Sequence, residues 1–204
     1  MHLRSARAVS VSVPALALAA AVLAPGAGTA LAGQPAGQGA GVVSVRGGPA
    51  AVAEASAERL ELAGEVAAAK YGTGKPIDDP ARERDVLRDV AGRAGGLGVG
   101  QRRAAAVFRD QIEANKAVQR GLHAYWDAHP EYRPVHRPDL AREVRPALDR
   151  LTGELLNGLA ATRAAHAGPS CSARLAFGGV RAAQVRHFDA LHTEALVRAV
   201  RSVC

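Results

Sequence analysis

The 204-residue sequence contains few aromatic residues and very few lysines. Phe, Trp and Tyr make up only 3% of the chain, against 48% hydrophobic residues that are mostly Ala, Val and Leu. This composition favours helices and argues against an aromatic-rich β-sandwich. Among the 26 basic residues only Lys70, Lys75 and Lys116 are lysines. The net charge of +7 permits acidic partners, but a general bias towards Arg produces the same charge, so charge alone identifies no function.

Common enzyme signatures are also missing from the sequence. It has no G-x-S-x-G nucleophile motif, no P-loop and no H-E-x-x-H metal motif. The glycines at 95–100 follow a predicted helix and lack the G-x-G-x-x-G spacing, so we interpret them as a linker. His187 and His192 are five residues apart, which does not match the i,i+4 spacing of two ligands on one helix. Nucleophilic and metal-assisted catalysis are therefore disfavoured, and no metal site is predicted.

The first 32 residues have the layout of a secretory signal peptide. Arg4 and Arg7 precede an apolar run over 8–24, and small residues lead to an expected cleavage site after Ala32. A membrane anchor is the alternative reading. The run is short for a span of about 20 residues, is interrupted by Ser and Pro, and has no basic stop-transfer flank. We therefore expect an exported protein with no membrane partner after cleavage.

Cysteine is scarce, and the two that exist, Cys171 and Cys204, both lie in the C-terminal quarter. Two cysteines in an exported protein predict one structural disulfide. The bond would close a loop of about 34 residues and contribute about 3–4 kcal/mol by loop-entropy reasoning.

The rest of the chain has a helical pattern almost throughout. Residues 33–49 lack periodicity and are interpreted as a flexible lead-in, and the helical domain is expected over 50–204. No credible strand and no internal repeat are found, so the sequence predicts an all-α bundle of about five helices. The expected helices cover about 50–71, 80–92, 102–129, 139–167 and 172–204.

Two helix starts can be predicted in more detail. Asp79 is a natural N-cap, with Pro80 at the first helical position and Arg82 and Glu83 in the first turn. Pro146 lies inside the fourth helical segment, where it removes a backbone donor and disfavours helix at the preceding residue. Either that helix kinks at the proline or its regular part starts there.

Cations are interleaved with uncharged hydrogen-bonding residues along these helices. Arg59 and Lys70 are eleven residues apart, so they lie on nearly the same face of one helix. Asn115 and Gln119 are four apart and share the face beside an apolar stripe. Such residues could bind an anion or could form a solvated surface, and the spacing alone favours the surface.

Over about 53–204 the sequence resembles the secreted subclass of the all-helical chorismate mutases. The single disulfide of that subclass also fits the wide spacing of the two cysteines. The matching stretches are Ala57-Glu58-Arg59-Leu60-Glu61, Val66-Ala67-Ala68-Ala69-Lys70, Pro76-Ile77-Asp78-Asp79 with Arg82, Val107-Phe108-Arg109-Asp110-Gln111-Ile112, Pro138-Asp139-Leu140, Pro169-Ser170-Cys171, Arg186-His187-Phe188-Asp189 and Cys204.

The resemblance implies the conversion of chorismate to prephenate, a unimolecular Claisen rearrangement that needs no cofactor. Because the substrate is a dianion, arginines suit it well, since their planar forks bind carboxylates with two hydrogen bonds. Carried over by position, Arg59, Arg82 and Arg145 are similar to the carboxylate-binding arginines of the family. Arg142 is the alternative for the third of these arginines, because the length of the connector before the fourth helix forces a one-residue gap in the match to the family.

The remaining family positions are polar. The resemblance implies that Lys70 and Gln119 hydrogen-bond the ether oxygen of the substrate, where negative charge grows in the transition state. Asp79 and Glu83 match the positions that hold the ring hydroxyl. Asn115 occupies a position where Ser or Thr is more usual, and we expect it to be tolerated because Asn can still donate a hydrogen bond.

Three functions remain to be compared. A secreted chorismate mutase acting on chorismate is favoured, and the resemblance implies a homodimer in which each pocket is built within one chain. An exported helical protein that binds an anionic ligand without turnover is the alternative. A nucleic-acid binder is disfavoured, because exposed aromatic residues interleaved with a basic stripe are lacking.

Overall fold

The structure is a computed structural model that describes residues 48–162 and 169–204, which belong to one compact unit covering 42–204. The described residues form α-helices, one 3₁₀ turn and one short π-helix, without a strand, which confirms the predicted all-α fold. None of the described helices is long and apolar enough to cross a bilayer. The predicted signal peptide and residues 33–47 of the expected lead-in lie outside the described part of the chain.

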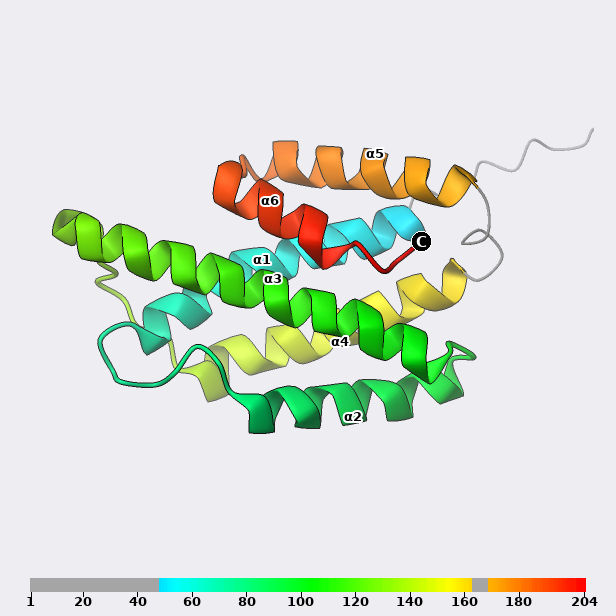
Figure 1. The fold of residues 1–204 in the computed structure, drawn as a ribbon, viewed down its shortest axis with the longest axis horizontal. Coiled ribbons are helices and arrows are strands. Elements are labelled where there is room, and N and C mark those ends of the chain that lie inside the picture. Colours follow the sequence, from blue (N-terminus) through cyan, green and yellow to red (C-terminus); the bar gives the residue numbers. More distant parts are fainter. Residues whose placement is uncertain (1–47, 163–168) are drawn as a thin grey trace, which may run out of the picture. The chain divides into compact units, whose positions relative to one another are not determined.

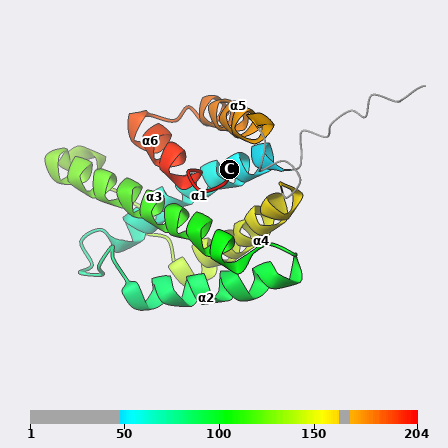
Figure 2. The same cartoon turned by 45° about the vertical axis from the view of Figure 1, so that its right-hand side comes forward.

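One helix, α1, lies at the centre of the packing. It contacts α3, α4, α5 and α6, while α2 packs mainly on α3. In both views α5 and α6 lie on one side of α1 and α3, and α2 and α4 lie on the other (Figures 1 and 2). The helices are α1 (Pro49–Lys70), α2 (Pro80–Gly96), α3 (Gln101–Ala128), α4 (Arg145–Ala161), α5 (Pro169–Val185) and α6 (Ala190–Ala199).

The first three predicted helices agree with α1, α2 and α3 to within a few residues, except that α2 continues to Gly96. Pro49 starts α1 at a position where a missing N–H costs nothing, and the helix ends just before Gly72, whose φ is +68°. Asp79 caps α2 as predicted, because its side chain accepts a hydrogen bond from the backbone N–H of Arg82 at 3.0 Å.

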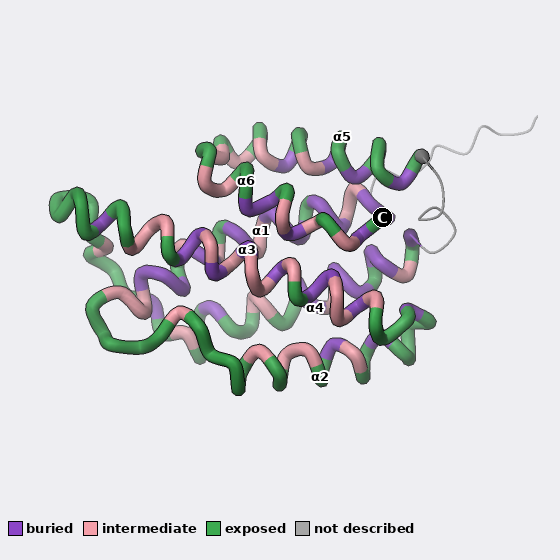
Figure 3. Tube along the Cα trace, in the orientation of Figure 1, coloured by how far each residue is buried: buried purple, intermediate pink, exposed green. Residues whose placement is uncertain are grey.

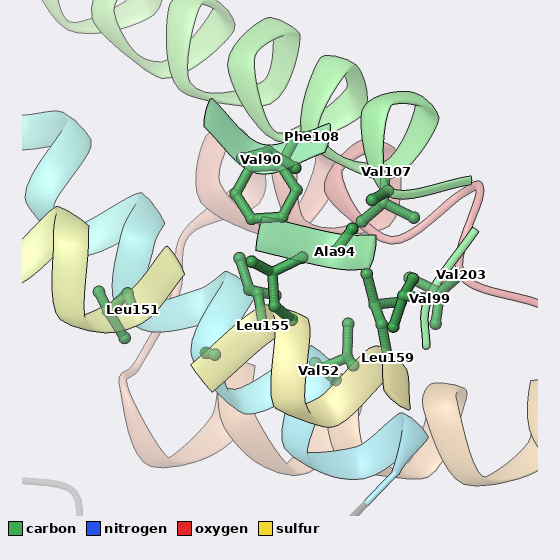
Figure 4. Close-up of a cluster of buried hydrophobic side chains, with 14 of the residues drawn as sticks. Val52, Val90, Ala94, Val99, Val107, Phe108, Leu151, Leu155, Leu159 and Val203 are labelled. Carbon is green, nitrogen blue, oxygen red and sulfur yellow. The ribbon is translucent and has the colours of Figure 1, made fainter. Parts of the chain in front are cut away.

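The main hydrophobic core lies where α1, α2, α3 and α4 meet. Leu155 and Leu159 of α4 pack with Val52 of α1 and Phe108 of α3, and all four side chains are fully buried (Figure 4). Burying a side chain of this size stabilises the fold by about 1.5–3 kcal/mol. The same cluster takes only Val90 and Ala94 from α2 as buried residues, so α2 is tied to the core near its C-terminal half.

Small residues allow the helices to approach α1 closely. A Cβ atom added to Gly178 of α5 would lie 2.8 Å from the Cα atom of Ala50. A Cβ atom at Gly158 of α4 would lie 2.7 Å from Cγ2 of Val52. Because α1 itself presents mostly alanines and valines at its buried positions, these contacts bring helix backbones together and leave α1 buried along most of its length (Figure 3).

The structure resolves the conflict at Pro146. A π-helical turn, η2 (Leu140–Val144), precedes α4, and regular α-helix starts at Arg145, next to the proline. The N–H of Arg145 donates to the carbonyl of Leu140, which closes the wider turn. The next residue, Pro146, has no N–H to donate. The segment still begins at Asp139 as expected, since this side chain accepts from the N–H groups of the next turn.

The expectation of one helix from 172 to the C-terminus is wrong. The segment forms α5 and α6, separated at His187, whose positive φ of 52° is incompatible with a continuous α-helix. Asp189 then caps α6 by accepting a hydrogen bond from the N–H of His192 at 2.8 Å. The predicted disulfide is confirmed, with Cys171 and Cys204 separated by 33 positions and their Cα atoms 5.9 Å apart.

Candidate active site

A cavity of about 1290 Å³ lies between α1, α2, α3 and the segment that leads into α4. Eight of the nine candidate residues from the sequence line it, although they come from four helices and a loop. Arg142, the alternative to Arg145, does not line the cavity, and its side chain is 88% exposed. The candidate residues that the fold brings together are Arg59, Lys70, Asp79, Arg82, Glu83, Asn115, Gln119 and Arg145.

The uneven packing of α2 positions one wall of this cavity. No residue of α2 before Val90 is fully buried, and only Val86 and Leu87 in that half pack partly against the core. The tube view shows this half of α2 and the loop before it as exposed or partly exposed (Figure 3). The polar first turn, with Arg82 and Glu83, therefore lies beside the cavity instead of in the core.

Arg59 is held in place from α4 and α3. Its Nη1 donates to the carbonyl of Leu148 at 3.1 Å and to Oγ1 of Thr152 at 3.2 Å, and its Cζ lies 5.7 Å from the ring centroid of Phe108. Burial lowers the pKa of Arg59 to about 10, with Asp149 acting in the opposite direction. The guanidinium is therefore oriented by neutral groups and remains a cation at neutral pH.

Lys70 lies three turns further along α1 and also faces the cavity. Its Nζ donates to the carbonyl of Ile77 at 3.3 Å, which ties the end of α1 to the loop before α2. Partial burial lowers the pKa of Lys70, while Asp79, Asp78 and Glu83 oppose this change. The ammonium has three N–H groups, and among the described residues it donates only to the carbonyl of Ile77, so it keeps donors for a ligand.

Gln119 and Asn115 form a pair on α3. Nε2 of Gln119 donates to Oδ1 of Asn115 at 2.6 Å, and the side chain of Gln119 is almost fully buried. Its Oε1 is buried and has no hydrogen-bond partner among the described residues. An unsatisfied buried polar atom costs about 1–3 kcal/mol, so this carboxamide has unused hydrogen-bonding capacity at the cavity wall.

Six of the cations that line the cavity share one property. The described residues contain no ion pair to any of these six side chains, whereas Arg88, Arg93, Arg150, Arg186 and Arg198 are each paired with a carboxylate. Unpaired cations around one cavity can bind a ligand with more than one negative charge. The predicted site residues Arg59, Lys70, Arg82 and Arg145 are four of the six, and Lys75 and Arg137 are the other two.

Sequence reasoning missed further charged residues in the cavity wall. Lys75, Arg93 and Arg137 line it, and so does Lys116, which forms ion pairs with Asp78, Glu83 and Glu113. The i,i+3 spacing of Glu113 and Lys116 was visible in the sequence, but the contacts from the other two carboxylates depend on tertiary structure. Within the described residues no group of three His, Cys, Asp or Glu side chains could hold a metal ion.

Comparisons with known proteins point to one family. The family model described as chorismate mutase type II matches residues 50–120. A secreted chorismate mutase of Mycobacterium tuberculosis (strain ATCC 25618 / H37Rv) is 32% identical over 155 residues, covering 76% of this chain and 77% of that protein. A secreted chorismate mutase of Mycolicibacterium smegmatis (strain ATCC 700084 / mc(2)155) is 34% identical over 151 residues, covering 74% of this chain and 83% of the relative.

Solved structures give the same result. The crystal structure of a chorismate mutase from Burkholderia thailandensis is similar with a TM-score of 0.72 and 38% identity, covering 76% of this chain and 98% of that one. The chorismate mutase from Burkholderia phymatum gives a TM-score of 0.71 and 33% identity, covering 75% of this chain and 93% of that one. At these identities the likeness extends beyond the fold to the sequence.

Proposed function

Because the chain belongs to the secreted chorismate mutase family, we propose that its cavity converts chorismate to prephenate with the residue roles expected from the sequence. The main support is that Arg59, Lys70, Arg82 and Arg145 line one cavity and form no ion pair with a described carboxylate. A dianionic substrate supplies the missing negative charge. The activity itself follows from the family, and the roles of individual residues are the proposal.

The reaction sets two requirements on the protein. The extended substrate has to be held in a chair-like conformer, so that the carbon atoms that form the new bond are close together. The ether oxygen gains negative charge as its C–O bond breaks, so donors directed at it stabilise the transition state more than the ground state. No group on the protein needs to transfer a proton or form a covalent bond in this pericyclic step.

Arginines and polar residues divide these tasks in the proposed mechanism. Arg59, Arg82 and Arg145 bind the two carboxylates and so hold the compact conformer, because a guanidinium offers two parallel donors to a carboxylate. Arg59 is the best prepared of the three, since Leu148 and Thr152 already orient it. A preoriented cation loses little conformational entropy when the substrate binds.

The remaining side chains act on the ether oxygen and the ring hydroxyl. Lys70 and Gln119 donate to the ether oxygen, Gln119 after its carboxamide has turned so that Nε2 takes the place of the unpartnered Oε1. Asp79 and Glu83 accept from the ring hydroxyl, and Asn115 hydrogen-bonds Gln119 or the substrate. The amide nitrogen and oxygen of Gln119 exchange places on rotation by 180°, so the side chain can present its donor to the substrate.

The proposal is tested by adding chorismate to the purified mature protein and following the loss of its ultraviolet absorbance. We expect saturable turnover without added metal or cofactor. A protein that binds chorismate in calorimetry but does not turn it over would be the exported binding protein that the sequence left as the alternative. The absence of both binding and turnover would contradict the assignment of the cavity.

Export and assembly belong to the same proposal. We expect cleavage after Ala32, a catalytic domain over 50–204 with the preceding residues as its lead-in, and a homodimer with one cavity built in each chain. Support for export comes from the signal-like N-terminus and from the disulfide that joins Cys171 to Cys204. The N-terminal sequence of the exported protein tests the cleavage site, and its mass in solution by light scattering tests the dimer.

A further inference from the structure

One cation in the cavity wall is surrounded by carboxylates instead of being free for a ligand. The side chain of Lys116 on α3 is only 10% exposed. Its Nζ lies 2.6 Å from Oε1 of Glu113, 3.2 Å from Oε1 of Glu83 and 3.2 Å from Oδ1 of Asp78. These carboxylates come from α3 itself, from the first turn of α2 and from the loop before α2, so one ammonium joins three segments.

The charge of Lys116 is stable in this position. Burial alone lowers its pKa, but the hydrogen bonds to Glu113, Asp78 and Glu83 outweigh burial and raise the pKa above the ordinary value. The ammonium therefore stays charged at neutral pH. Without it, three carboxylates would face one another beside a cavity that binds an anion, which would repel the ligand and push the segments apart.

Apolar packing holds the substrate-facing half of α2 only through the partly buried Val86 and Leu87. The fully buried residues of α2, Val90 and Ala94, lie at least seven positions after Glu83. The start of the helix is instead tied to α3 by polar contacts, from Lys116 to Glu83 and Asp78, and from Arg120 to both oxygens of Asp78 at 2.7 Å. Of these two cations only Lys116 reaches a residue of α2 itself.

We propose that Lys116 is a positioning residue, which holds Glu83 and the first turn of α2 against α3 so that Glu83 and Arg82 meet the substrate. The inference rests on the proposed function, because Glu83 matters as a substrate contact only if chorismate binds in this cavity. Lys116 bonds Oε1 of Glu83, and no described hydrogen bond uses Oε2, which remains for the ring hydroxyl.

A double-mutant cycle tests this coupling. Lys116→Met keeps the length of the side chain but removes the charge, and Glu83→Ala removes its partner. We expect Lys116→Met to lower kcat/KM by about 10- to 100-fold, because small displacements of substrate-binding groups have effects of this size. In the Glu83→Ala background the same change should lower kcat/KM by less than about threefold, since the group being positioned is already missing.

Glu113→Gln is the matched control. It weakens the shortest contact of Lys116, but Glu113 does not line the cavity, so kcat/KM should stay within about threefold of the wild type. The melting temperature is measured for every variant. A purely structural role would lower the melting temperature and cost the same factor in both backgrounds.

Two results would overturn the inference. One is a Lys116→Met protein with wild-type kcat/KM, and the other is an equal loss with and without Glu83. If Lys116→Met does not fold, Lys116→Gln replaces it in the cycle. If the wild type does not turn chorismate over, the proposed function fails separately. The same cycle is then measured with the dissociation constant of chorismate instead of kcat/KM. Unchanged binding of chorismate by the Lys116 variant would then overturn the inference.

Discussion

Arg59 combines two properties that are hard to reconcile in water. Its guanidinium is desolvated beside the ring of Phe108 and yet remains charged. Hydrogen bonds to Leu148 and Thr152 fix its orientation. Other arginines of the described residues, such as Arg88 and Arg150, are instead paired with nearby carboxylates. A cation that is prepared in this way interacts strongly with an anionic ligand, because no counter-ion has to be displaced and little water has to be removed.

Removal of such a cation should therefore be costly for catalysis and not for folding. We predict that Arg59→Ala or Lys70→Ala lowers kcat/KM by at least about 10²–10³-fold, the usual cost of losing one preorganised charge or donor. The helical far-UV circular dichroism signal should be unchanged. Steady-state kinetics on chorismate measure the loss.

Arg84→Ala is the control for these variants. Arg84 is on α2 in an exposed position and does not line the active-site cavity. Its replacement should leave kcat/KM within about threefold of the wild type. A loss as large as that of Arg59→Ala would show that the number of positive charges matters and not their place in the cavity.

Gln119 should make the reaction insensitive to acidic pH. Replacement of Gln119 by Glu introduces a carboxyl that donates a hydrogen bond only while it is protonated. Burial at this position raises the pKa of such a carboxyl. We predict that kcat/KM of Gln119→Glu is highest at acidic pH and falls as the pH rises through that pKa, whereas the wild type shows no such fall. A flat pH profile for the variant would argue that this side chain does not face the ether oxygen.

Much of the cavity could be predicted at the level of single residues, because the family pattern of cations and amides is visible in the sequence. The neighbours of those residues could not. Nothing near Lys116 in the sequence indicates that Asp78 and Glu83 reach it, since both contacts depend on how α2 lies against α3. The sequence likewise did not show that Arg145 lines the cavity and Arg142 does not, since this depends on the course of the backbone through η2 into α4.

Packing of the helices depends on small residues at their crossings. In α5 the adjacent residues Gly178 and Gly179 have opposite surroundings. A Cβ atom at Gly178 would meet the backbone of Ala50 at 2.8 Å, while one at Gly179 would have no neighbour within 4 Å.

We predict that Gly178→Ala lowers the free energy of unfolding by about 1–3 kcal/mol, because a backbone contact cannot give way as a flexible side chain can. The neighbouring change Gly179→Ala should instead raise it by about 0.5–1 kcal/mol, as for glycines in the interior of other helices. Denaturant unfolding of the two variants measures both effects. Equal effects would mean that α5 does not approach α1 as closely as described.

Helix starts with a side-chain cap were easier to predict than helix ends. Asp79 and Pro80 together identified the start of α2 correctly. The break between α5 and α6 was missed, although Asp189 is also a good N-cap, because the apolar pattern continues through Phe188. A periodic apolar pattern shows which face of a helix is buried. When two consecutive helices pack on the same core, the pattern does not show where one ends and the next begins.

On the scale of the whole molecule, the disulfide lies apart from the cavity. It joins α5 to the C-terminus, whereas no described residue of α5 or α6 lines the cavity. We predict that the double change Cys171→Ser and Cys204→Ser lowers the free energy of unfolding by about 3–4 kcal/mol. Below the melting temperature of this variant kcat should be unchanged. A lower kcat in fully folded protein would show that the C-terminal helices also shape the cavity.

The central claim is that the cavity is complementary to the compact, doubly negative transition state and not to the extended substrate. The most direct measurement is the inhibition constant of a bicyclic ether dicarboxylate that has the shape of the chair-like transition state. The account predicts an inhibition constant at least about 10²-fold below KM, as for other transition-state analogues, and weaker inhibition of Arg59→Ala. An inhibition constant equal to or above KM would contradict it.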